Sequence, residues 1–149
     1  MSLGARRTLL WVLAAFGLLV GPWALLFPAH WYETFPDGFA NAGLDQWILL
    51  DGPFNEHMIR DIGAMNLALA AASIFAALSR STTAARVAAV AWITFSAPHL
   101  IYHVQHLHGL STLDTIVEPI SLTFTLLLPI PLLLPSRSSR RDPAEPERN

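Results

Sequence analysis

Four long stretches of apolar residues constrain the fold of this chain more than any other feature. They cover residues 8–27, 62–78, 87–107 and 115–134. An α-helix needs about 20 apolar residues to cross the hydrocarbon core of a bilayer, and each stretch is close to that length. The pattern therefore predicts an all-α fold, a bundle of four transmembrane helices with a long outer loop between helices one and two.

The composition supports a membrane protein and argues against several soluble classes. Hydrophobic residues make up 53% of the 149 residues, charged residues make up 13%, and the mean hydropathy is +0.44. A soluble domain usually has about 25% charged residues, so we expect the lipid bilayer as a partner and no nucleic acid. The chain contains no Cys and no Lys, which excludes disulfides, thiolate metal sites, Schiff-base lysines and P-loops.

The placement of arginine predicts an orientation. All but one of the arginines fall before the first stretch, between the second and third, or after the fourth, at positions 6, 7, 80, 86, 137, 140, 141 and 148. Arg60 alone falls on the opposite side, together with most of the acidic residues. The positive-inside rule therefore predicts a multi-pass protein of the plasma (inner) membrane with both termini cytoplasmic.

The sequence predicts one domain and a tail. We expect residues 1–135 to form the four-helix transmembrane domain and residues 136–149, which are polar and proline-bearing, to form a disordered cytoplasmic tail. Pro129, Pro131 and Pro135 predict irregular last turns in the fourth helix, because proline removes a backbone donor.

The outer loop, residues 28–53, is rich in aromatic side chains. These are Trp31, Tyr32, Phe35, Phe39 and Trp47. We favour an aromatic belt at the level of the lipid headgroups, which is where amphipathic rings concentrate. The alternative is a lid over a site at the outer mouth. Residues 44–50 are a candidate for a short interfacial helix.

Ionisable residues gather at the outer ends of three predicted helices. Charged or imidazole side chains at membrane depth are costly and usually mark a functional site. Helical spacing places His99 and His103 on one face, and His57 one turn from Asp61. We expect the three helices to direct these groups toward one outer cavity. The set comprises Glu56, His57, Arg60, Asp61, His99, His103, His106, His108, Asp114 and Glu118.

Several chemistries suit such a cluster. The candidate metal ligands are His99, His103, His57 and Glu118, which favour zinc or iron over a cuprous site because the chain has no Cys. Haem with one axial histidine from each of the second and third helices is an alternative. Glu118, Asp61 and Arg60 are the candidate catalytic residues. A hydrogen-bonded network that fixes helix register, or a path for a proton or ligand, would use the same residues.

Three segments carry a resemblance to a known group of proteins. They are Trp31-Tyr32 with Phe35-Pro36, the run DGPFNEHMIRDIG at 51–63, and PHLIYH at 98–103. Together they resemble small bacterial, especially actinobacterial, membrane proteins that are loosely similar to the DoxX-like four-helix group. The resemblance covers residues 8–134 and implies a four-helix membrane bundle in a redox-associated setting. The lack of Cys argues against a thiol-redox version.

Two functions are consistent with these patterns. One is a metal- or haem-dependent membrane oxidoreductase or hydrolase that acts on a lipophilic substrate from the outer leaflet. The other is a non-enzymatic small transporter or accessory membrane subunit whose polar cluster is structural or conducts protons. A second copy of the chain or another membrane subunit is the expected protein partner in the second case.

Overall fold

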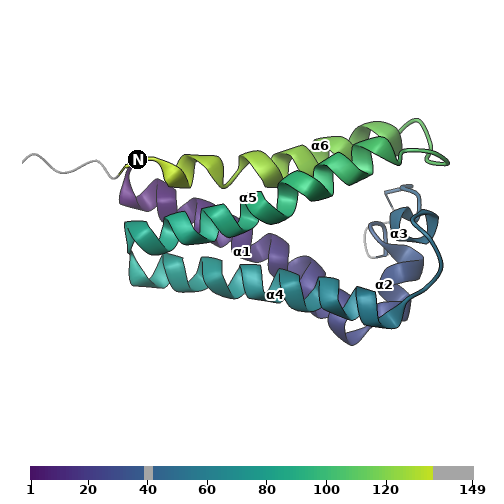
Figure 1. The fold of residues 1–149 in the computed structure, drawn as a ribbon, viewed down its shortest axis with the longest axis horizontal. Coiled ribbons are helices and arrows are strands. Elements are labelled where there is room, and N and C mark those ends of the chain that lie inside the picture. The colour runs from purple at the N-terminus through teal and green to yellow at the C-terminus, as the bar shows by residue number, and fades with distance from the viewer. Residues whose placement is uncertain (39–41, 136–149) are drawn as a thin grey trace, which may run out of the picture.

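The computed structural model describes residues 1–38 and 42–135, and within them every regular element is helical (Figure 1). The four long helices are α1 (Leu3–Leu26), α4 (Glu56–Ser79), α5 (Thr82–Gln105) and α6 (Asp114–Leu127). Three short elements join or follow them, α2 (Pro28–Thr34), α3 (Trp47–Leu50) and the 3-10 helix η1 (Ile130–Leu133). The predicted all-α four-helix bundle is confirmed. The predicted tail, 136–149, lies outside the described residues.

Four helices are long and apolar enough to cross a membrane, the fourth running from Asp114 to Leu133 through η1. Side-chain caps begin three of the long helices. Ser2, Asn55 and Ser81 accept hydrogen bonds from backbone N–H groups three residues later, at 3.3, 3.2 and 3.2 Å. The end of α6 at Leu127, followed by a 3-10 turn, confirms the irregular last turns predicted from its prolines.

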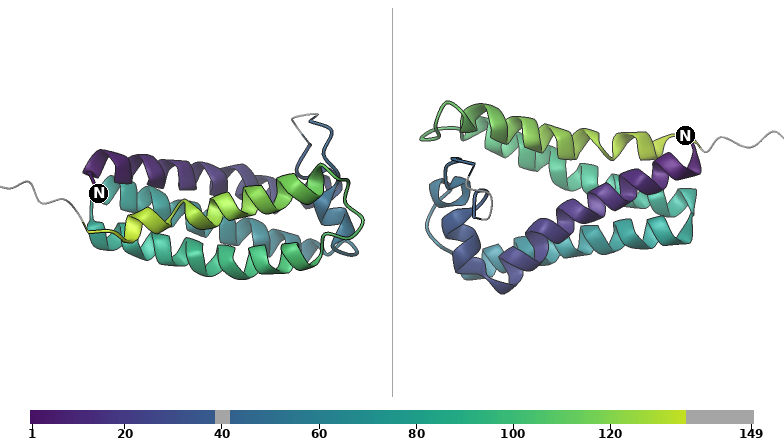
Figure 2. Two further views of the ribbon diagram at one scale, coloured as in Figure 1. Left: turned by 90° about the horizontal axis from the view of Figure 1, so that it is seen from above. Right: turned by 180° about the vertical axis from the view of Figure 1, so that it is seen from behind.

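The bundle consists of two helix pairs. Helix α1 packs along α4, α5 packs along α6, and α4 meets α5 through the tight turn at Arg80, which has a φ of 55°. The pairs lie close together where Met1, Pro135 and this turn meet, which we call the terminal end. They diverge at the opposite end, which carries α2, α3 and residues 106–113 and which we call the loop end (Figures 1 and 2).

The crossing of α1 and α4 depends on glycine. A Cβ atom on Gly63 would lie 2.5 Å from the backbone nitrogen of Leu25 and 2.9 Å from the carbonyl oxygen of Gly21. A Cβ atom on Gly17 would lie 2.6 Å from the carbonyl oxygen of Asn66. Without these side chains the two backbones approach closely, as small residues permit in membrane helices.

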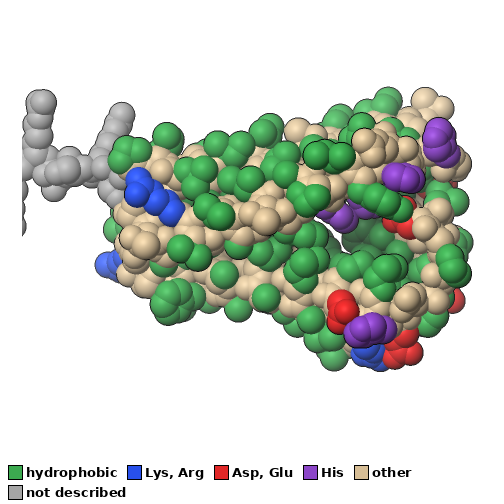
Figure 3. Space-filling model, viewed as in Figure 1, with side chains coloured by type: hydrophobic (Ala, Val, Ile, Leu, Met, Phe, Trp, Pro, Cys, Tyr) green, Lys and Arg blue, Asp and Glu red, His purple; other side chains and the backbone are tan. Residues whose placement is uncertain are grey.

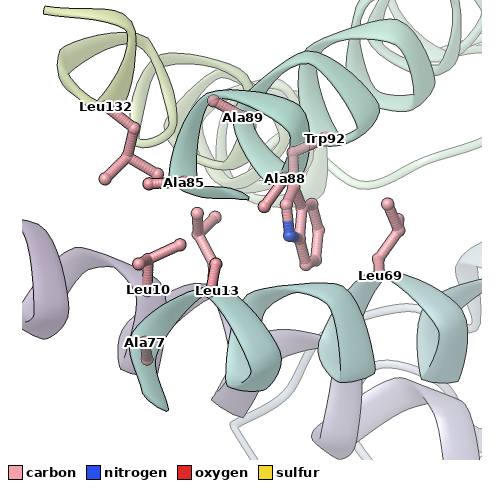
Figure 4. Packing of buried hydrophobic residues seen from close by; sticks show 10 residues of the cluster. Leu10, Leu13, Leu69, Ala77, Ala85, Ala88, Ala89, Trp92 and Leu132 are labelled. Carbon is pink, nitrogen blue, oxygen red and sulfur yellow. The ribbon is translucent and has the colours of Figure 1, made fainter. Parts of the chain in front are cut away.

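An apolar core fills the half of the bundle toward the terminal end (Figure 4). Alanines on α5 bring that helix close to its neighbours, and Trp92 fills the centre. The indole nitrogen of Trp92 donates to the hydroxyl of Ser73 at 2.9 Å, so the buried ring leaves no unpaired donor. The buried members include Leu10, Leu13, Leu69, Ala77, Ala85, Ala88, Ala89, Trp92 and Leu132.

Polar contacts join the described ends of the chain. The amino group of Met1 donates to the carbonyl of Pro135 at 2.8 Å. Arg6, which is 3% exposed, donates to the hydroxyl of Thr82 at 2.5 Å and to the carbonyl of Leu134 at 2.9 Å. Both ends therefore lie at the same end of the bundle.

The loop between α1 and α4 folds into a packed unit at the loop end. Trp31 and Trp47 are 3% and 8% exposed, and Trp31 joins a cluster with Trp23 and Ile59. The aromatic belt favoured from the sequence is wrong for these two tryptophans, because their rings stabilise the loop itself. Phe39 lies outside the described residues. The predicted helix at 44–50 is confirmed only over Trp47–Leu50.

Candidate functional site

A buried ion pair or hydrogen bond joins α5 to α6 near the loop end. Nδ1 of His103 lies 2.6 Å from Oε1 of Glu118, and the two side chains are 10% and 4% exposed. Unpaired, either group would be costly to bury, whereas together they share a proton or a charge–charge contact. Among residues 1–38 and 42–135, the side chain of His103 makes this contact through Nδ1 and no hydrogen bond through Nε2.

His99 lies one turn further into the bundle. Its ring contacts His103 edge-on, with the centroids 4.6 Å apart, and stacks on Phe95 with the centroids 5.0 Å apart. Within the described part of the chain, neither ring nitrogen of His99 makes a hydrogen bond. His99 therefore offers a nitrogen to whatever enters the space beside it.

Ser96 shares this face of α5, as expected from helical spacing. Its side chain is 2% exposed, and its hydroxyl has no partner among the described residues. Buried polar groups are almost always hydrogen-bonded, so an unpaired one calls for a partner such as water or a ligand. Ser96, His99 and His103 thus form a row of polar groups with unused hydrogen-bonding capacity.

Asp51, in the turn between α3 and α4, adds an acid to this group. Partial burial raises the pKa of its carboxyl above the usual value, although the side chain still reaches water. Nearby His103 and His106 lower that pKa, and nearby Glu118 raises it. These influences place Asp51 within electrostatic reach of the His103–Glu118 pair. Asp51 was not selected from the sequence as a site residue, although it begins the run 51–63 that carries the resemblance.

The predicted site residues of α4 lie elsewhere. His57 and Asp61 form a 3.5 Å pair on the surface, with side chains 87% and 67% exposed. Arg60 pairs with Glu56 at 2.8 Å and donates to the carbonyl of Leu25 at the end of α1. The expectation that three helices direct their ionisable groups into one cavity is therefore wrong for α4. The first turns of α4 face water, and Arg60 satisfies a carbonyl at the end of the neighbouring helix.

Asp114 stabilises the loop. Its carboxylate accepts hydrogen bonds from the Trp47 indole at 2.7 Å, the backbone N–H of Asp45 at 3.1 Å and the Ser111 hydroxyl at 2.5 Å. The side chain is fully buried. These contacts fix the segment before α3 to the start of α6, and so they help to place Asp51 near the His103–Glu118 pair.

Two hollows border the site. A cleft of about 680 Å³ lies at the loop end, between the α3–α4 turn and the first turns of α4, and Asp51 lines it. A second hollow, of about 500 Å³, lies between α4 and α5. On the face that Figure 3 shows, the surface is hollowed between these two helices toward the loop end, and histidine side chains border the hollow. The second hollow is lined by Met65, Leu69, Ala91, Thr94, Phe95 and Pro98.

The residues present do not fit a metal ion or haem. Within the described residues, no three His, Asp or Glu side chains converge as metal ligands would, whereas a zinc site needs three or four protein ligands. His99 and His103 are adjacent, but Nδ1 of His103 is already engaged by Glu118. Haem bound between two helices would need His57 opposite this pair, and His57 is on the surface.

The comparison of this chain with protein-family models, with curated proteins and with solved structures gives no match. The resemblance to the DoxX-like group therefore stays a prediction. The structure supports the class of all-α four-helix bundles whose long helices could span a membrane. In this bundle a His–Glu pair is buried near one end.

Proposed function

We propose that this chain is a multi-pass protein of the plasma membrane, with the terminal end in the cytoplasm and the loop end outside. Arg6, Arg7, Arg80 and Arg86 all belong to the terminal end, and Arg60 is the one described arginine at the loop end. The positive-inside rule supports this orientation. The contact between Met1 and Pro135 supports placing both described ends of the chain on one side of the membrane.

We further propose that the His103–Glu118 pair is an outward-facing proton-exchange site. The single observation that carries this proposal is the 2.6 Å contact between two buried ionisable groups on facing helices. A proton shared by such a pair can pass to a molecule bound at the free nitrogen of His103 or at His99. Asp51, which is exposed to water and within electrostatic influence of the pair, is the candidate group for passing the proton to the outer solution.

The site exchanges protons with one side only. Between Ser96 and the terminal end, the bundle is filled by apolar side chains around Trp92, Leu13 and Leu69. A continuous water path to the terminal end is not supported by this packing, since buried apolar cavities stay dry. The proposal is therefore a binding and proton-transfer site, as a small carrier or an accessory subunit would use it, and not an open proton channel.

A metal- or haem-dependent oxidoreductase or hydrolase is the weaker proposal, because the donor set suits neither cofactor. Its remaining support is the proximity of His99, His103 and Glu118. Elemental and optical analysis of the purified protein tests it, with the His99/His103 double alanine variant as control. Stoichiometric zinc or iron, or a Soret band, that disappears in the double variant would favour the metal or haem version.

Infrared difference spectroscopy after a pH step tests the proton-exchange proposal on the protein in lipid nanodiscs. Because the two groups share one proton, we expect the carboxyl and imidazole bands to change together. Glu118→Gln should remove both bands. The matched control Glu56→Gln, at a surface pair, should leave them unchanged. An unchanged spectrum in Glu118→Gln would show that the pair serves only to hold α5 against α6.

A further inference from the structure

The hollow between α4 and α5 has a composition that differs from that of the site beside it. Its walls, residues 65, 69, 91, 94, 95 and 98, are almost entirely apolar. Met65 is 39% exposed, so the hollow opens on the side of the bundle that would face acyl chains in a membrane. A volume of about 500 Å³ lies within the range of small-molecule pockets.

Polar groups without partners lie on α5 beside residues that line this hollow. Phe95 is both a wall of the hollow and the ring on which His99 stacks, so the two spaces share a boundary. Next to Phe95 on α5, the buried hydroxyl of Ser96 has no hydrogen-bond partner among the described residues. Among these residues, His99 makes ring contacts with Phe95 and His103 but no hydrogen bond. Pro98 has no N–H, so the carbonyl of Thr94, another wall residue, lacks its usual helical donor.

The charges nearby select against an anionic head group. Glu118 and Asp51 are acids, and the imidazole of His103 is already paired with Glu118. A phosphate or carboxylate bound at His99 would be repelled by these acids, and no unpaired cationic side chain among the described residues beside His99 would offset the repulsion. A cationic head would have to compete with His103 for Glu118. An uncharged group that donates and accepts hydrogen bonds matches Ser96, His99 and the Thr94 carbonyl.

We propose that a neutral amphiphile from the bilayer enters sideways between α4 and α5 and binds with its polar head at Ser96 and His99 and its hydrocarbon part in the hollow. This inference rests on the proposed function, because the amphiphile would lie beside the His103–Glu118 pair, where a hydroxyl head group can accept one proton while it releases its own and so remains neutral. It adds the ligand class, the route and the residues that hold the head group.

Photolabelling tests the proposal directly. The full chain in nanodiscs is exposed to a long-chain alcohol that carries a diazirine in its chain, and the labelled residues are mapped by mass spectrometry. We expect label concentrated at Met65, Leu69 and Phe95. The alkyl phosphate with the same chain should label these residues far less. Equal labelling of the hollow by both probes would overturn the neutral ligand class.

Variants test the head-group contacts and the opening of the hollow separately. Ser96→Ala and His99→Phe should each reduce labelling of the hollow by the alcohol about 3- to 10-fold, the change expected for one lost hydrogen bond. Met65→Trp should block the opening, whereas Val87→Trp, at a position of α5 that is 63% exposed, should not. Because both tryptophan variants alter exposed positions, neither depends on repacking the core.

Labelling spread evenly over lipid-facing residues such as Leu19 and Phe75 would overturn the inference. That result together with intact infrared bands would overturn the amphiphile alone and leave the proton-exchange site standing. Concentrated labelling in a protein without the infrared response would support the binding site and overturn proton exchange. The two proposals therefore fail separately.

Discussion

The carboxylate of Asp114 accepts hydrogen bonds from a side chain and a backbone N–H of the outer loop and from the hydroxyl of Ser111. An amide at this position can accept through only one of its two atoms, so Asp114→Asn leaves a buried donor facing another donor. We expect Asp114→Asn to lower the free energy of unfolding by about 1–3 kcal/mol. Denaturant unfolding in detergent measures this value.

Asp61→Asn is the matched control for that prediction. Asp61 makes only a surface contact with His57, and exposed pairs contribute about 0–1 kcal/mol. An effect of Asp61→Asn as large as that of Asp114→Asn would contradict the assignment of Asp114 as the residue that fixes the loop.

Asp51 should make the stability depend on pH in the direction opposite to most acids. Its pKa is raised by burial above 3.8 in the folded protein, so at pH values between 3.8 and the raised pKa the folded state binds more protons than the unfolded state. Stability should therefore fall as the pH rises through this window and stay lower above it.

Asp51→Asn removes this dependence. The variant should be more stable than the parent at neutral pH, and the difference should vanish below pH 3.8, the ordinary value for this carboxyl. Unfolding curves at a series of pH values measure the profile. Parallel profiles for the parent and Asp51→Asn would contradict a desolvated Asp51.

Residue spacing predicted part of the site and could not predict the rest. His99, His103 and Glu118 follow from polar positions on facing helices, and the structure brings these three together. His57, Arg60 and Asp61 have the same kind of spacing. Helix α1 ends beside the first turns of α4, so His57 and Asp61 face water and Arg60 contacts the end of α1. The spacing of residues along one helix does not show where the neighbouring helix ends along the bundle axis.

Helix α4 crosses α1 at a distance that only glycine permits. Gly63→Ala would place a methyl group 2.5 Å from the Leu25 backbone nitrogen, and backbone atoms cannot move aside singly. We expect a loss of about 1–3 kcal/mol, which is typical of overpacking. Thermal unfolding monitored by circular dichroism measures the loss.

Gly4→Ala provides the comparison, because a Cβ atom there meets nothing within 4 Å. Alanine is the better helix former, so this variant should be neutral or more stable by up to about 1 kcal/mol. If both variants lost the same stability, the close crossing of α1 and α4 would not be the cause.

The long elements were predictable from the sequence because length and apolarity alone determine a spanning helix. The 28–53 loop was not, because its fold depends on contacts between distant residues. Trp47 lies inside because Asp114, more than sixty positions later, accepts its N–H. No local pattern distinguishes such a tryptophan from one at a lipid headgroup.

The orientation of the whole bundle has a direct test, because the chain contains no cysteine. Gln46→Cys places a thiol on an exposed position at the loop end, and Thr83→Cys places one on an exposed position at the terminal end. In intact cells, a membrane-impermeant maleimide should label Gln46→Cys. It should label Thr83→Cys only after the membrane is permeabilised.

The cysteine-free parent gives the background of this measurement. The reverse pattern would place the His103–Glu118 site on the cytoplasmic side, and the proposed exchange with the outer solution would then be wrong. Labelling of both positions in intact cells would contradict a membrane-spanning bundle.

The pairing of α1 with α4, rather than with the next element in the chain, has a consequence for biosynthesis. A ribosome must complete residues 27–55 before the partner of α1 begins to emerge. In the proposed membrane protein, the first helix would therefore wait in the bilayer without a neighbour, and it is the most apolar of the four. Helix α5, the least apolar, would leave the translocon when α4 is already present to pack against it, before α6 supplies Glu118 as the partner of His103. The order of synthesis thus brings the histidine-bearing helix into the bilayer once it has protein to pack against.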